Sequence, residues 1–136
     1  MWRDVDSGWR TGARYGSRMS QAPRGQFHVE MPDGLVIERL PVGHAHGHWR
    51  VWFVASGVSF STGKPPRAVR FLQEFYDRVT IEGIGGDLNH RGGGSGGGDG
   101  EQEVHMNYLA DGITGLRITY RHEGEVVASE VIDLVR

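Results

Sequence analysis

One segment of this 136-residue chain has the apolar spacing of an α-helix, and the other patterned segments alternate apolar and polar residues as β-strands do. The helical segment spans residues 66–79, where Ala68, Leu72, Phe75 and Val79 share one face. No strand–helix–strand repetition occurs, so a parallel nucleotide-binding sheet is not expected. The sequence therefore predicts an α+β domain: an antiparallel sheet of about six or seven strands with one amphipathic helix, arranged in two layers or as a partly closed barrel.

The expected strands are runs of period-two alternation or of nearly continuous apolar residues. They cover residues 26–31, 35–40, 48–55, 104–109, 116–121 and 126–135. Pro32-Asp33-Gly34 separates the first two runs, and this turn chemistry predicts a β-hairpin. The last three runs, with short turns between them, predict a three-stranded meander.

Length and composition suggest two parts within a single folding unit, since ~100–200 residues usually make one domain. Residues 1–25 lack periodicity and form an expected flexible, basic and aromatic arm. Residues 26–136 form the α+β domain, with an expected glycine-rich loop at 85–100. Residues 92–98 read Gly-Gly-Gly-Ser-Gly-Gly-Gly, which is also the composition of an engineered linker.

The absence of cysteine excludes disulfides, thiolate catalysis and cysteine metal sites. The first 25 residues hold no apolar core of a signal peptide, and no apolar run approaches the ~20 residues that span a bilayer, so we expect a soluble, cytoplasmic protein without membrane contacts. Lys64 is the only lysine beside fourteen arginines. This imbalance is typical of a GC-rich genome, such as that of a bacterium or its phage.

The arm is the first candidate binding segment, because it combines arginines with aromatic residues and carries a net charge of +3. Tryptophan and arginine are enriched at protein–protein hot spots, which favours docking to a protein. The same residue types contact phosphates and stack on bases in single-stranded nucleic acid, which keeps a nucleic-acid partner open. The partner-binding residues predicted here are Trp2, Arg3, Trp9, Arg10, Arg14, Tyr15 and Arg18.

A histidine triplet is the second candidate. In an extended segment alternate side chains point the same way, so His44, His46 and His48 would converge on one transition-metal ion. Three histidines with an open position resemble the ligand set of a catalytic zinc site. Gly43 and Gly47 oppose this hypothesis, because they indicate a turn.

The favoured interpretation is a non-enzymatic protein-interaction domain of the accessory, inhibitor, immunity or small-assembly type. It would dock a protein partner or a second copy through its arm and a sheet edge. No serine lies in a Gly-x-Ser-x-Gly elbow and no catalytic constellation stands out, so we expect no catalytic residues and no cofactor. The alternatives are a metal-binding protein or metal-dependent enzyme using the histidine triplet, and a nucleic-acid binder using the arm.

Overall fold

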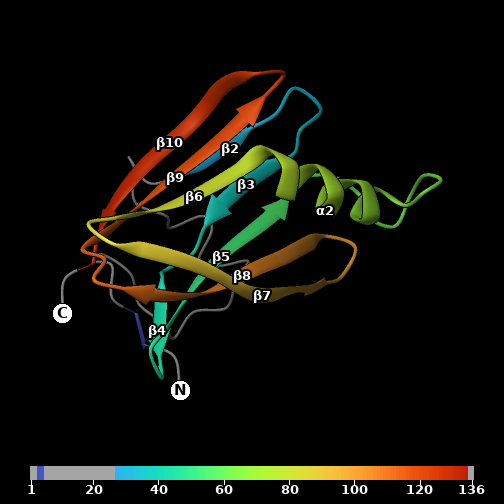
Figure 1. Cartoon of the computed structure of the whole chain (residues 1–136). Coiled ribbons are helices and arrows are strands. Elements are labelled where there is room, and N and C mark those ends of the chain that lie inside the picture. The colour runs from blue at the N-terminus through green and yellow to red at the C-terminus, as the bar shows by residue number, and fades with distance from the viewer. Residues whose placement is uncertain (1–2, 5–26, 135–136) are drawn as a thin grey trace.

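The structure is a computed structural model that describes residues 3–4 and 27–134 (Figure 1). Its described part contains ten antiparallel strands in two sheets and one helix, α2 (Arg67–Arg78). The described residues include no helix long and apolar enough to cross a membrane. The broad expectation of an antiparallel α+β fold with one helix is therefore confirmed for the described residues. The expected sheet of about six or seven strands is wrong, because ten strands are divided between two sheets.

Seven strands form sheet A, centred on β5, which pairs with β8 along one edge and with β3 and β4 along the other. Its strands are β1 (Arg3–Asp4), β2 (His28–Glu30), β3 (Val36–Arg39), β4 (Gly43–Ala45), β5 (His48–Ser56), β7 (Asp87–Gly97) and β8 (Glu101–Asp111). The predicted hairpin of β2 and β3 is present. Its turn is closed by a bond from the Gly34 amide to the Met31 carbonyl at 3.0 Å.

Three strands form sheet B, in the order β10-β9-β6. They are β6 (Val79–Ile84), β9 (Gly115–His122) and β10 (Glu125–Asp133). In Figure 1, α2 runs directly into β6, so the helix leads the chain from one sheet to the other. The predicted meander is wrong, because β8 pairs with β5 and β7 in sheet A, whereas β9 and β10 pair in sheet B.

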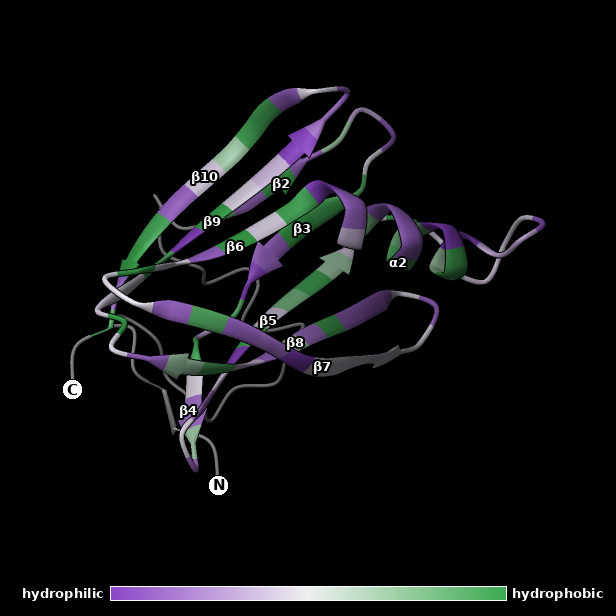
Figure 2. Ribbon diagram, in the orientation of Figure 1, coloured by the Kyte–Doolittle hydropathy of each residue, from purple (hydrophilic) through white to green (hydrophobic). Residues whose placement is uncertain are grey.

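The core lies between the two sheets and the buried face of α2. Figure 2 shows the apolar residues concentrated on alternate positions of the strands and on one side of the helix. The ring of Phe75 on α2 lies 5.0 Å from that of Phe53 on β5 and 6.0 Å from that of Tyr120 on β9. Aromatic contacts therefore join sheet A, the helix and sheet B.

Two expectations about architecture are corrected. The two sheets of the described residues do not close into a barrel, so the expectation of a partly closed barrel is wrong. The glycine-rich loop expected at 85–100 is largely the strand β7, which pairs with β8 along its length. A Cβ atom on Gly93 would collide with the His105 carbonyl oxygen, and one on Gly97 would collide with that of Glu101. Glycine at these two positions thus permits a close approach of two backbones. The loop was expected because a high glycine content is also typical of a flexible coil.

Candidate functional site

Most of the predicted arm lies outside the described residues, including Trp2, Trp9, Arg10, Arg14, Tyr15 and Arg18. Only the backbone of Arg3 and Asp4 is placed, as β1, which pairs with Gly43 and His44 of β4. Residues 3–4 thus lie beside the segment that carries the histidine triplet. Its role in binding stays a prediction.

The histidine triplet lies on a tight hairpin and not on one extended strand. Ala45 pairs with His48, and the two residues between them, His46 and Gly47, have φ values of 53° and 78°. Two successive positive φ angles form the turn that suits a two-residue hairpin. The alternation argument fails here, because His44 and His48 lie on opposite arms of the hairpin and His46 lies at its tip.

Two contacts of these histidines lie within the hairpin. The His44 ring lies 4.3 Å from the ring of its cross-strand partner Trp49, and His48 Nδ1 lies 3.1 Å from the His46 carbonyl oxygen. Cross-strand partners share a face, so His44 and Trp49 lie on one face of the hairpin and His48 on the other. Among the described residues, no three His, Cys, Asp or Glu side chains gather to hold a metal ion.

Strand β10 forms the exposed edge of sheet B. Within the described part of the chain it pairs with β9 alone, along a register from Glu125 to Asp133. The amide of the next residue, Leu134, donates to the Thr114 carbonyl at 3.0 Å. Antiparallel ladders alternate, so Glu130 and Ile132 bond to β9 and the peptide groups of Ser129 and Val131 point away from it.

Three valines of β10 are unusually exposed for their type. The exposed fractions are 53% for Val126, 45% for Val127 and 55% for Val131. The ladder is irregular between Val126 and Ala128, so Val127 lies in a bulge, whereas pairing from Ala128 onward is regular. An edge with open peptide groups and exposed β-branched side chains is a template for adding another strand.

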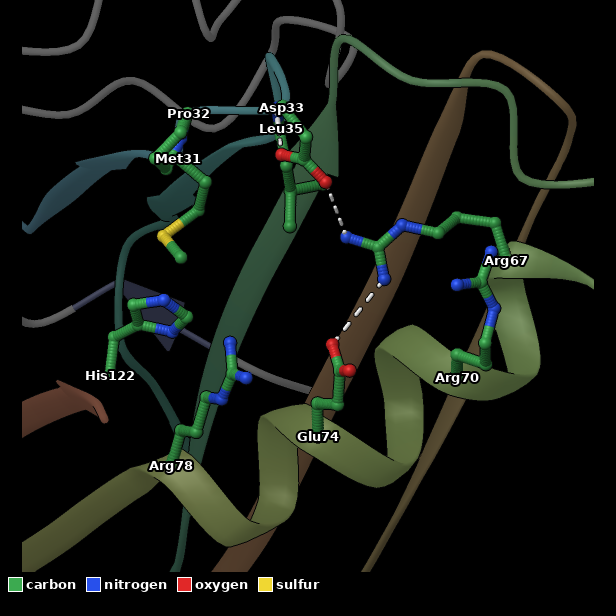
Figure 3. Close-up of a pocket in the computed structure, with 9 residues that line it drawn as sticks. All are labelled: Met31, Pro32, Asp33, Leu35, Arg67, Arg70, Glu74, Arg78 and His122. Carbon is green, nitrogen blue, oxygen red and sulfur yellow. Dashed lines mark hydrogen bonds and ion pairs between the residues drawn. The ribbon is translucent and has the colours of Figure 1, made fainter. Parts of the chain in front are cut away.

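A cleft of about 410 Å³ opens between α2 and the turns at the ends of both sheets (Figure 3). One wall is the polar face of α2, where the stripe Arg67, Arg70, Glu74 and Arg78 follows the helical period. The rest of the lining comes from the β2–β3 turn and from the end of β9: Met31, Pro32, Asp33, Leu35 and His122.

Arg67 is held at the centre of this cleft by two carboxylates. Its guanidinium donates to Asp33 Oδ2 at 3.1 Å and to Glu74 Oε1 at 3.4 Å, and its side chain is only 13% exposed. Figure 3 shows Arg67 reaching from α2 toward Asp33 on the opposite wall, with Arg70 beside it. The contacts fix the helix relative to the β2–β3 turn.

Arg78 and His122 lie on the other side of Glu74 (Figure 3). Burial raises the pKa of Tyr120, and a hydrogen bond from Arg78 to its hydroxyl acts in the opposite direction, which places this guanidinium beside β9. His122 Nδ1 is buried and has no hydrogen-bond partner in the described structure. Neither Arg70 nor Arg78 forms an ion pair with a carboxylate in the described part.

The cleft was not predicted from the sequence. The polar face of the helix was recognisable, but its convergence with the Pro32-Asp33 turn and with His122 depends on tertiary contacts between segments distant in the chain. The usable signal was the spacing of Arg67, Arg70 and Arg78, which places three guanidinium groups on one stripe of a short helix.

No protein-family model, curated protein or solved structure matches this chain. The function is therefore inferred from its own residues and geometry.

Proposed function

We propose that this chain is a non-enzymatic protein-interaction domain that binds a partner by strand addition at β10, with its N-terminal arm as a second contact. The observation that carries the proposal is the edge of β10, which among the described residues pairs with β9 alone and which carries exposed valines. Strand addition uses main-chain hydrogen bonds for affinity and alternate side chains for specificity.

Side-chain contacts of Glu130 connect β10 to sheet A. Glu130 points inward from β10 and forms a bidentate ion pair with Arg39 of β3, at 2.7 Å and 2.9 Å. The Glu130 carboxylate also accepts the Phe27 amide at 3.2 Å. These contacts hold β10 against sheet A, so a partner strand would meet a preorganised template and less conformational entropy would be lost on binding.

The valines supply the second element of recognition. Val131 and Val127 lie on the outer face of sheet B. On this face Val131 pairs with Arg117 of β9, and Ser129 pairs with Thr119. An added strand that carries apolar residues opposite Val127 and Val131 would cover both side chains. We infer a partner, either another protein or a second copy of this chain, that presents a β-strand with apolar alternate residues.

The test is native mass spectrometry of the untagged chain purified from its own host, compared with the variants V131K and V69K. Val69 is an exposed valine on α2, so V69K makes the same chemical change away from the edge. We expect a defined complex with the wild-type chain and V69K, and its loss with V131K. A complex that survives V131K would exclude β10 as the contact, and a monomer bearing one transition-metal ion would overturn the interaction proposal.

A variant lacking residues 1–24 tests the contribution of the arm separately. We expect the complex to dissociate more readily when the arm is removed, because two linked contacts bind more tightly than one. An unchanged complex would show that the arm is dispensable and would leave the β10 contact intact.

A further inference from the structure

We propose that the cleft between α2 and the β2–β3 turn binds an extended acidic segment of a protein, with carboxylates four residues apart. The site is separate from the β10 edge, and it gives the domain a second means of recognising a partner. The occupant is defined by charge complementarity to Arg70 and Arg78.

The cleft has two cations available to a ligand. Asp33 and Glu74 are both engaged with Arg67, whereas Arg70 and Arg78 have no carboxylate partner among the described residues. Guanidinium groups bind carboxylates in a planar, bidentate geometry. A ligand carboxylate at each arginine would therefore complete the pairing that the cleft itself leaves incomplete.

The spacing of the two arginines indicates the spacing of the ligand's acids. Arg70 and Arg78 are eight residues apart on α2, which corresponds to about 12 Å along the helix axis. An extended peptide rises about 3.3 Å per residue, so its residues i and i+4 lie about 13 Å apart and on one side. Two acids in this arrangement would reach both arginines at once.

The middle of the cleft sets the rest of the pattern. Glu74 lies between the two arginines on the helix stripe, so the ligand side chain at i+2 faces a carboxylate and should be neutral. Residues i+1 and i+3 project away from the helix, and the opposite wall offers the apolar surfaces of Met31 and Pro32. The expected pattern is acidic, apolar, neutral, apolar, acidic.

A spaced pair of carboxylates suits the cleft better than a polyphosphate backbone does. Asp33 and Glu74 line the same space and would repel a chain with a charge at every unit. The volume of about 410 Å³ lies within the range of ligand pockets, ~300–1,000 Å³. Arg70 is exposed and Arg78 is half-buried, so a ligand can reach both from solvent.

The proposal is tested by fluorescence anisotropy with a labelled peptide containing Glu-Val-Ser-Val-Glu and a matched peptide containing Val-Ser-Glu-Glu-Val. We expect the full chain to bind the first peptide more tightly than the second by about tenfold, which corresponds to one lost carboxylate contact. R70Q/R78Q should weaken binding of the first peptide by at least about tenfold, whereas R117Q/R121Q, with the same charge change on sheet B, should leave it within about twofold.

Several outcomes would overturn the proposal. These are equal binding of the two peptides, equal loss in R70Q/R78Q and R117Q/R121Q, and tighter binding of inorganic phosphate or of a single-stranded oligonucleotide than of the first peptide. Because Arg78 also contacts Tyr120, the single variant R70Q gives the same test without disturbing β9, with an expected loss of several-fold. V131K should bind the first peptide as the wild-type chain does, so failure at β10 and failure at the cleft are distinguishable.

Discussion

Arg39 of β3 and Glu130 of β10 form a buried, bidentate ion pair that connects sheet A to sheet B. Arg39 is 1% exposed and the Glu130 side chain 8%. The guanidinium also donates to the Leu40 carbonyl at 2.9 Å, so the charged groups are well supplied with hydrogen-bond partners. Removing one member leaves the other charge buried without its partner, which is more costly than removing both.

We expect E130L and R39M each to lower the free energy of unfolding by about 3–5 kcal/mol. The double variant R39M/E130L should recover part of this loss, because an apolar pair of similar volume avoids the desolvation cost of the ions. Urea unfolding measures all three. The exposed substitution E123Q is the control and should change stability by less than about 0.5 kcal/mol. A double variant as unstable as the sum of the single variants would contradict a direct coupling.

His28 makes the stability of the β2–β3 hairpin depend on pH. Burial acts to lower the pKa of His28, but hydrogen bonds to Glu38 and Glu30, at 3.1 Å and 3.0 Å, outweigh it and raise the pKa. Because the pKa of His28 is higher in the folded state, its ion pairs contribute to folding stability. This contribution is fully present below the unfolded pKa of 6.5 and is lost as pH rises through the folded pKa.

The Tm of the wild-type chain should therefore exceed that of H28Q by more at about pH 5.5 than at about pH 8. The effect is expected to be small, because the His28 side chain is 44% exposed and solvent screens the ion pairs. Thermal unfolding followed by circular dichroism at the two pH values is the measurement. A Tm difference that grows toward alkaline pH would contradict the assigned pairing.

Two glycines of β7 should respond differently to alanine, although they are three residues apart. A Cβ atom at Gly93 would collide with the His105 carbonyl of β8, whereas nothing lies within 4 Å of the corresponding position at Gly96. We expect G93A to lower the free energy of unfolding by about 2 kcal/mol or more and G96A to change it by less than about 0.5 kcal/mol. Equal effects in urea unfolding would show that β7 does not pair with β8 in this register.

The parts of the fold that were predictable depend on local patterns. The helix was expected at 66–79 and spans Arg67–Arg78, because its apolar residues follow the helical period. The hairpin of β2 and β3 followed from Pro32-Asp33-Gly34, in which Gly34 adopts a φ of 94°. Each of these signals lies within about a dozen residues and needs no knowledge of distant contacts.

The parts that were missed depend on contacts between distant segments. Strand β7 has little side-chain alternation, and the close approach of the β8 backbone accounts for Gly93 and Gly97. His44 and His48 do not share one extended strand as expected, because the chain turns at His46 and Gly47. The glycine at position 47 already indicated a turn in the sequence. Two further features depend on how the sheets pack and were not predictable from local patterns. These are the place of β9 in sheet B and the cleft at Arg78 and His122.

Amide hydrogen exchange by NMR gives the most direct test of binding at the β10 edge. The amides of Ser129 and Val131 face away from β9, whereas those of Glu130 and Ile132 bond to it and serve as internal references. In the isolated chain we expect Ser129 and Val131 to exchange faster than their neighbours. In the complex isolated from the host, we expect both amides to become protected. Unchanged exchange at Ser129 and Val131 in a stable complex would contradict strand addition at β10.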